Sequence, residues 1–145
     1  MISMKELDPK DEATSEQRAN LEILMERINK IRACWGRPMK VTSGLRSMED
    51  HLQIYRDKAS KKKAPFEDGV FDESKVPMKS KHLFGQAVDI YDPSKELQQW
   101  CEANEDKLKE IGLWMEAFSA TPNWCHFQIV PYGSYKESKS IWFNP

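Results

Sequence analysis

The stretch SKHLFGQAVDI, Ser80 to Ile90, decides the fold and raises the question of function. It places His82, one of three histidines in the chain, seven residues before Asp89. Over residues 85–91 the side chains alternate between two faces, as they do in a half-buried strand. The stretch therefore predicts a strand with a carboxylate on its wall and a histidine at its rim.

A second alternating stretch, WCHFQIV at residues 124–130, predicts a partner strand. Alternation places Trp124, His126 and Gln128 on one face and Cys125, Phe127 and Ile129 on the other, core-facing side. If the two strands are neighbours, Asp89 and His126 face each other across about 5 Å. Side chains capable of chemistry then meet on one face of a sheet.

His82, just before the first strand, can reach the same spot as Asp89 and His126. Two imidazoles and one carboxylate leave a fourth tetrahedral position for water, which is the arrangement of a catalytic zinc site. Gly85 permits close backbone approach, and Ser80 could hold His82 by a hydrogen bond of the kind that metal-bound imidazoles make. The spacing alone also leaves open a hydrogen-bonded core histidine without a metal.

Helical and strand periodicities alternate along the rest of the chain. They indicate an α+β fold in which a small antiparallel β-sheet is flanked by helices. A capping-box pattern at Thr14 and Gln17 precedes the first helix, and Trp142 and Phe143 are expected to dock on the body. The expected elements are helices at 14–32, from 47 onward and at 92–111, and strands at 39–42, 85–91, 113–116 and 124–131.

Residues 56–81 lack a sustained period and contain four lysines between Lys58 and Lys63. We expect a long exposed loop or flap there, which is unusual in a compact domain unless it is functional or mobile. The lysines are typical of a solvated surface. His51, in the preceding helix, is expected at the helix surface.

Composition places the chain among ordinary globular proteins. Its 145 residues suit a single domain, 1–145, and 31% charged residues with a net charge of −1 indicate no nucleic-acid partner. No run approaches the roughly eighteen apolar residues of a membrane span, and no signal peptide is recognisable. Cytoplasmic synthesis without membrane insertion is therefore expected. Three widely spaced cysteines predict reduced thiols.

The motif S-x-H-x-x-G-x-A-x-D over Ser80 to Asp89, followed by Trp-Cys-His at 124–126, resembles the zinc peptidases of the D-Ala-D-Ala carboxypeptidase and L-alanyl-D-glutamate endopeptidase family. That family shares its fold with the Hedgehog signalling domain. The SGLRS turn at residues 43–47 is similar to the family's S-G-x-R-S element. Together with the HLQIY and GLWME segments, this pattern resembles bacteriophage cell-wall lysis proteins or prophage copies of them.

The resemblance implies a peptidase that hydrolyses the stem peptide of bacterial peptidoglycan. Arg46 would pair with a substrate carboxylate or with the oxyanion of the tetrahedral intermediate, since guanidinium is a fixed fork of donors. Ser80 and Trp124 are candidates for the lining of the substrate site. An endolysin-like monomer that acts on the wall after release by a holin-type partner is also implied. The implied ligands of Zn²⁺, one ion per chain, are His82, Asp89 and His126.

One position departs from the family pattern. Family members commonly carry Glu or Asp three residues before the last histidine, where it takes a proton from the attacking water and passes it to the leaving amine. Asn123 stands there in this chain and cannot act as a base. Glu116, on the preceding strand, is the best substitute, with a parallel in the W-x-x-E segment of Hedgehog-type domains.

Three alternatives remain open. Asn123 favours a catalytically silent zinc-binding module of the same fold, against which Glu116 argues. A thiol hydrolase would use Cys125 or Cys34 with a histidine as base, although alternation turns Cys125 away from His126. A structural phage protein that merely carries the fold is the third.

Overall fold

A five-stranded sheet forms the centre of the computed structural model, which describes residues 1–131 and 140–144. The strand order is β1-β2-β4-β3-β5; β5 pairs with β3 in parallel, and the other neighbours are antiparallel. The α+β fold predicted from the sequence is confirmed. The strands are β1 (Val41–Ser43), β2 (Ala87–Tyr91), β3 (Trp114–Glu116), β4 (Trp124–Gln128) and β5 (Trp142–Phe143).

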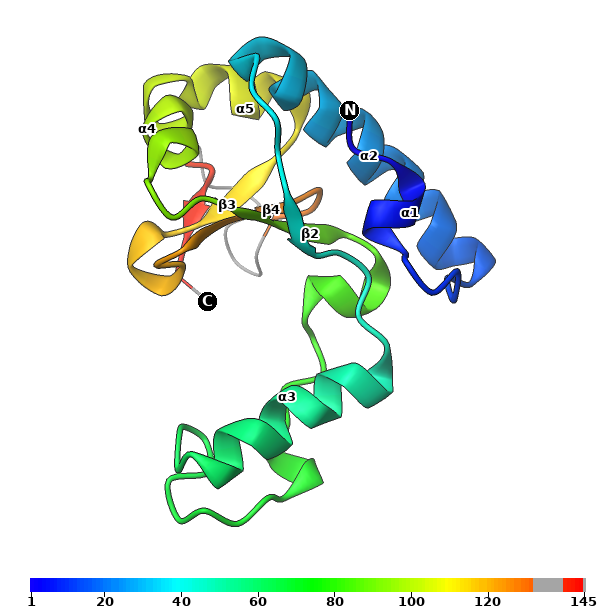
Figure 1. Cartoon of the computed structure of the whole chain (residues 1–145), viewed down its shortest axis with the longest axis vertical. Helices are drawn as coiled ribbons and strands as arrows, with labels where there is room; N and C mark the ends of the chain where they lie inside the picture. The colour runs from blue at the N-terminus through cyan, green and yellow to red at the C-terminus, as the bar shows by residue number, and fades with distance from the viewer. Residues whose placement is uncertain (132–139, 145) are drawn as a thin grey trace.

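Helices cover one face of this sheet (Figure 1). Their buried apolar residues and those of β2, β3 and β4 form one cluster, in which Ile28 and Phe127 are fully buried. Each such side chain stabilises the fold by about 1.5–3 kcal/mol relative to exposure, so this cluster is the main core. None of the described helices is long and apolar enough to cross a membrane. The helices of this body are α1 (Met4–Leu7), α2 (Ser15–Trp35), α4 (Glu96–Ala103) and α5 (Glu105–Ile111).

Local side chains define where these helices begin. Thr14 and Gln17 form the predicted capping box at the start of α2. The helix predicted from Asp92 begins instead at Glu96. The cause is the Asp92 carboxylate, which accepts hydrogen bonds from two main-chain N–H groups in the first turn of α4 and so caps it from four residues upstream.

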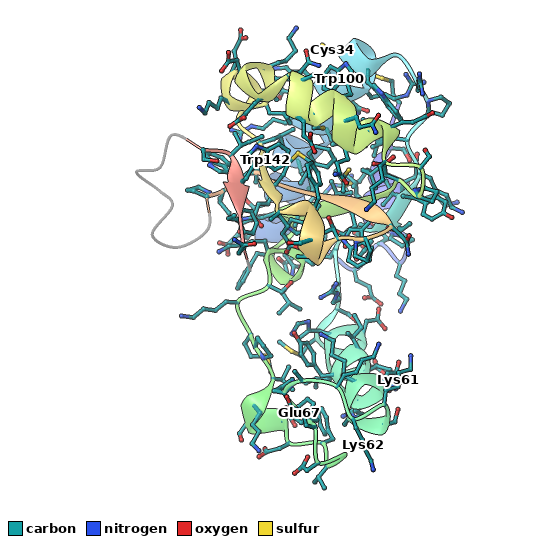
Figure 2. All side chains as sticks on the ribbon, turned by 90° about the vertical axis from the view of Figure 1, so that its left-hand side faces the viewer. Cys34, Lys61, Lys62, Glu67, Trp100 and Trp142 are labelled. Carbon is teal, nitrogen blue, oxygen red and sulfur yellow. The ribbon has the colours of Figure 1, made fainter. Side chains whose placement is uncertain are left out.

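The chain between β1 and β2 forms a lobe, residues 48–80, that projects from the sheet on the side away from α2, α4 and α5 (Figure 1). The lobe contains α3 (Met48–Ser60) and a short 3₁₀-helix, η1 (Glu73–Lys75). Figure 2 shows Lys61 and Lys62 at its far end, and both are exposed, as the sequence predicts for the lysines of this segment.

The lobe has more internal structure than the exposed loop predicted over residues 56–81. Residues 56–60 are the last turns of α3. Phe66 and Val76 are buried together with Ala59 in a small hydrophobic cluster separate from the main core. The apolar residues of this cluster do not recur at helical or strand spacing, so the sequence pattern gave no sign of it.

The face of the sheet that the helices leave uncovered carries the polar residues. Asp89 of β2 lies opposite His126 of β4 in the antiparallel register, as expected for neighbouring strands. Directly opposed residues point to the same face. The 3₁₀-helix η2 (Lys81–Phe84) ends at Gly85, whose left-handed φ of 73° turns the chain into β2. This turn brings His82 to the same face.

Gly44, in the turn between β1 and α3, packs directly against α1. A Cβ atom at this position would lie 2.4 Å from the carbonyl oxygen of Leu7, and the N–H of Leu45 donates to that same oxygen over 2.8 Å. We expect Gly44→Ala to lower the free energy of unfolding by about 1–3 kcal/mol, as overpacked sites do. Urea unfolding of the two proteins measures the difference. An unchanged midpoint would mean that α1 moves away freely.

Candidate metal centre

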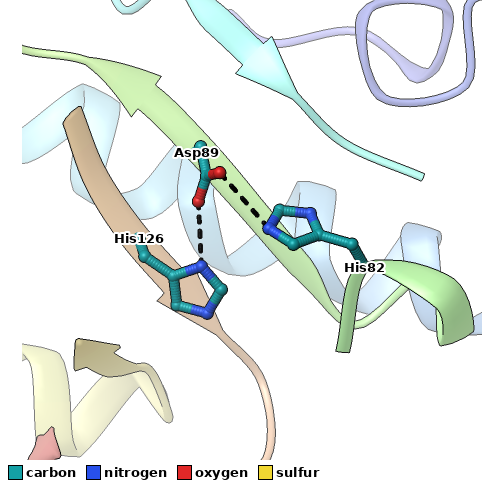
Figure 3. Close-up of side chains that lie close together, drawn as sticks. All are labelled: His82, Asp89 and His126. Atoms are coloured by element: carbon teal, nitrogen blue, oxygen red, sulfur yellow. Dashed lines mark hydrogen bonds and ion pairs between the residues drawn. The ribbon is translucent and has the colours of Figure 1, made fainter. Parts of the chain in front are cut away.

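Asp89 lies between two imidazoles on the uncovered face of the sheet (Figure 3). Its Oδ1 is 2.8 Å from Nδ1 of His126, and its Oδ2 is 3.3 Å from Nε2 of His82. Each residue offers one ligand atom, and these atoms all lie within 4.8 Å of one another. Both histidines are buried and Asp89 is nearly so. The three residues that the sequence brings forward thus form one group that could hold a metal ion.

The second nitrogen of each imidazole is held by an acceptor outside the group. Nδ1 of His82 lies 2.9 Å from the carbonyl oxygen of Gly44, so this nitrogen carries a hydrogen and donates it, while Nε2 faces Asp89. Nε2 of His126 lies 2.8 Å from Oε1 of Gln128. The amide nitrogen of Gln128 donates to the carbonyl of Val130, which fixes the oxygen toward His126.

This arrangement fits a metal on the chemistry of its donors. Nε2 of His82 and Nδ1 of His126 face the same carboxylate, and each can give its lone pair to a metal ion that takes the place of its hydrogen. Metal-bound histidines are held in the same way, with the far nitrogen donating to a carbonyl or side-chain oxygen. Nitrogen, nitrogen and oxygen donors with room for a further ligand are typical of catalytic zinc.

Asp89 and His126 each shift the pKa of the other. Burial on its own would raise the pKa of the Asp89 carboxyl, but hydrogen bonds from His126 and His82 outweigh it and hold that pKa well below its usual range. Burial on its own would lower the pKa of His126, but the hydrogen bond and charge of Asp89 raise it above the ordinary value. A metal ion therefore competes with a proton for His126.

Gln128 is a residue whose role sequence reasoning missed, although alternation places it on the face of His126. We expect Gln128→Leu to weaken metal affinity about 10- to 100-fold, the usual effect of losing such a support. Gln128→Glu keeps an acceptor for Nε2–H and should stay closer to wild type. Competition with a chromophoric chelator measures both. Equal affinities for all three proteins would contradict the role.

Glu116, at the end of β3, lies beside the group. Its Oε1 is 3.9 Å from Nε2 of His126, and its side chain is 20% exposed. Burial raises the pKa of Glu116 above the ordinary value, and its charge also interacts with those of Asp89 and Arg46. Asn123, by contrast, is exposed. A carboxylate with a raised pKa next to a metal group suits proton transfer.

Arg46 is fastened next to the group at its main chain and its side chain. Its N–H donates to the carbonyl of His82 over 3.1 Å, and its Nη1 lies 3.3 Å from Nδ1 of His51. The guanidinium interacts electrostatically with Asp89 and Glu116. His51, expected at the helix surface, is instead completely buried, because α3 turns this face toward the chain that returns from the lobe.

The remaining predicted site residues take different places. Ser80 precedes η2, but Nδ1 of His82 is bound by Gly44 and not by Ser80. Gly44 directly follows β1, which pairs with β2, and this pairing brings the Gly44 carbonyl within hydrogen-bond distance of the His82 ring. Trp124 is half-buried and is the first residue of β4, the strand that contains His126. Its partner across the sheet is Tyr91 of β2.

The thiols lie away from this group. Cys125 belongs to the core on the helix-covered face and donates to the buried Asp92 carboxylate. Burial holds the pKa of the Cys125 thiol far above its ordinary value. Cys34 is exposed near the end of α2, next to Lys107. A buried thiol of high pKa, turned from the histidines, is not a nucleophile.

A pocket of about 650 Å³ borders Arg46. It lies between the start of α2, the SGLRS turn and η2, and its lining includes Met48, Met78 and Phe84. These three apolar side chains are all partly exposed. His82, Asp89 and His126 are not among its lining residues, so Arg46 is the site residue that borders this pocket.

Comparison with known proteins agrees with this geometry. The family model described as VanY, D-alanyl-D-alanine carboxypeptidase, matches residues 14–141, a range that includes the metal group, Glu116 and Arg46. No curated protein and no solved structure matches the chain. The chain belongs to the VanY D-alanyl-D-alanine carboxypeptidase family, zinc-type peptidases that hydrolyse the peptides of peptidoglycan.

Proposed function

We propose that the chain binds one Zn²⁺ through His82, Asp89 and His126 and uses it to hydrolyse the stem peptide of peptidoglycan. The single observation that carries this proposal is the convergence of the three donors, with their far nitrogens already held by Gly44 and Gln128. When bound, zinc supplies a Lewis acid that polarises the scissile carbonyl and acidifies water.

Glu116 is proposed to move the proton. A carboxylate beside the attacking water takes its proton as the water adds to the carbonyl, and then gives that proton to the departing amine. Two observations support this role: Glu116 lies 3.9 Å from Nε2 of His126, on the side of the ring away from Asp89, and burial raises the pKa of Glu116 above its ordinary value. Asn123 cannot replace it, because an amide has no basic lone pair at neutral pH.

Arg46 is proposed to bind negative charge on the substrate. Its guanidinium remains protonated at every relevant pH and offers several donors in one plane. It could meet the free carboxylate at the end of the stem peptide or the oxyanion that forms during attack. The pocket that borders Arg46 has room for a part of the peptide that extends past this contact. We propose that Ser80 and Trp124 contact the peptide elsewhere.

The biological role that we propose is cell-wall lysis of the endolysin type. Its support is the sequence resemblance of the SGLRS, HLQIY and GLWME segments to phage lysis proteins. In this role the chain works as a monomer and reaches the wall after a holin-type partner opens the membrane. Expression in a bacterium together with a membrane-permeabilising agent should cause lysis, and the agent alone should not.

Digestion of purified peptidoglycan, followed by mass spectrometry of the released muropeptides, tests the catalytic proposal. Loss of a terminal D-alanine identifies a carboxypeptidase, whereas separation of L-alanine from D-glutamate identifies an endopeptidase. Zinc bound at one ion per chain without any cleavage would instead support a silent metal-binding module. Asn123 is the observation that favours this second candidate.

A further inference from the structure

A chain of hydrogen bonds joins the lobe to the metal centre through His51. We propose that His51 is a positioning residue that holds the Arg46 guanidinium in place beside the metal centre. The inference rests on the function proposed above, because it assigns His51 a part in the work of Arg46. Three observations carry it: the partners of the two ring nitrogens, the burial of the ring, and the attachment of Arg46.

The partners of His51 define its tautomer. Nε2 lies 2.6 Å from the carbonyl oxygen of Pro77. A carbonyl can only accept, so Nε2 carries the hydrogen. Nδ1 of the neutral ring then has a free lone pair, and the group that it faces is Nη1 of Arg46 at 3.3 Å. Guanidinium can only donate, so the two contacts are mutually consistent.

The His51 ring has little freedom to turn. It is completely buried, and it packs against Tyr55 with ring centroids 5.1 Å apart and planes inclined by 60°. Tyr55 in turn contacts Phe66 within the small core of the lobe. Burial also lowers the pKa of His51, which favours the neutral ring that can accept from Arg46. The lobe therefore presents a fixed acceptor to the guanidinium.

Arg46 is bracketed by the chain that returns from the lobe to the sheet. At one end of this segment the carbonyl of Pro77 binds His51, and at the other the carbonyl of His82 binds the main-chain N–H of Arg46. A long arginine side chain has many rotamers, and ordering it in advance removes an entropic cost from substrate binding or the transition state. His51 supplies the contact that orders its end.

A double-mutant cycle tests the proposal. His51→Phe is expected to lower kcat/KM for peptidoglycan fragments about 10- to 100-fold, because a misplacement of about 1 Å can cost that much. The loss should fall on the same parameter, kcat or KM, that Arg46→Ala changes. In the Arg46→Ala background, His51→Phe should add little, since residues that act as a unit are non-additive. Fully additive losses would overturn the proposal.

Matched variants separate positioning from folding. His51→Gln offers both a donor for Pro77 and an acceptor for Arg46, and it should recover most of the activity that His51→Phe loses. Glu49→Gln, at an exposed position of the same helix, is the control. Zinc affinity, measured by chelator competition, should be unchanged in all of them. A loss of zinc affinity in His51→Phe would contradict action through Arg46.

An NMR measurement that does not depend on enzymatic activity separates failure of this inference from failure of the proposed function. Long-range ¹H–¹⁵N spectra of the wild-type protein should show His51 as the Nε2–H tautomer, with the assignment taken from His51→Gln. The Nδ1 resonance should move in Arg46→Ala. If wild type cleaves nothing and these signals are found, the function fails and the arrangement stands. A protonated Nδ1, or a resonance that Arg46→Ala leaves in place, overturns the inference.

Discussion

Removing the metal, or His126, is expected to reduce peptide hydrolysis to the background rate. A Lewis acid at the scissile carbonyl contributes several kcal/mol, so its loss should cost at least about 10³-fold in kcat. Wild type treated with a strong chelator and His126→Ala should behave alike when muropeptide release is followed with time. Metal analysis should give one zinc per wild-type chain and strongly reduced zinc in the variant.

Restoration is the control for this prediction. Adding zinc to chelated wild type should recover activity, and adding magnesium should not, because two imidazoles and one carboxylate are poor ligands for magnesium. His126→Ala should stay inactive at zinc concentrations that restore wild type. Full activity of a chelated protein with no measurable metal would exclude the proposed chemistry.

The proton on His126 makes metal binding depend on pH. The pKa of His126 is raised above its ordinary 6.5 by Asp89, so the metal-free ring keeps its proton to higher pH than an ordinary histidine. Zinc must displace that proton, and its affinity should fall as the pH is lowered through and below the raised pKa. Calorimetry in two buffers of different ionisation enthalpy measures the proton released.

The metal group could be predicted from sequence because local strand patterns and a family resemblance pointed to the same three residues. Alternation gave the face of Asp89 and of His126 within each strand, the condition that the strands are neighbours set them opposite each other, and the resemblance to a zinc-peptidase family implied the ligand set. The capping box of Thr14 and Gln17 could also be predicted, because it depends only on two residues three positions apart. The capping box and the alternation within each strand depend on residues a few positions apart, whereas Asp89 and His126 are 37 positions apart and their pairing had to be assumed.

Supporting contacts could not be predicted, because they join residues distant in sequence through the main chain. The acceptor for His82 is the carbonyl of Gly44, and the acceptor for His51 is that of Pro77. Every residue has a main-chain carbonyl, so the residue type does not indicate which carbonyl will accept a hydrogen bond from a histidine. Gln128 is different: alternation placed it on the face of His126, two residues away, but its role as the acceptor for that imidazole was not inferred from this position.

Replacing Glu116 by glutamine is expected to lower kcat about 10²- to 10⁴-fold while zinc stays bound, because general acid–base catalysis contributes an effect of this size. Glutamine keeps the size of the side chain but cannot accept a proton from water at neutral pH. Glu116 is not among the three candidate ligands, so zinc content should remain one per chain. Activity on purified peptidoglycan and metal analysis measure the two quantities separately.

Asn123→Ala is the matched control and decides between the two sites for the base. Asn123 is exposed and offers no titratable group, so this variant should retain nearly the full wild-type rate. Glu116 is partly buried, 3.9 Å from His126. It should carry out the proton transfer that Asn123, standing where family members have Glu or Asp, cannot perform. If Glu116→Gln cleaves as fast as wild type, another group carries the proton. If wild type binds zinc and cleaves no stem peptide, the carboxylate at Glu116 is not sufficient, and the asparagine marks a site that binds metal without catalysis.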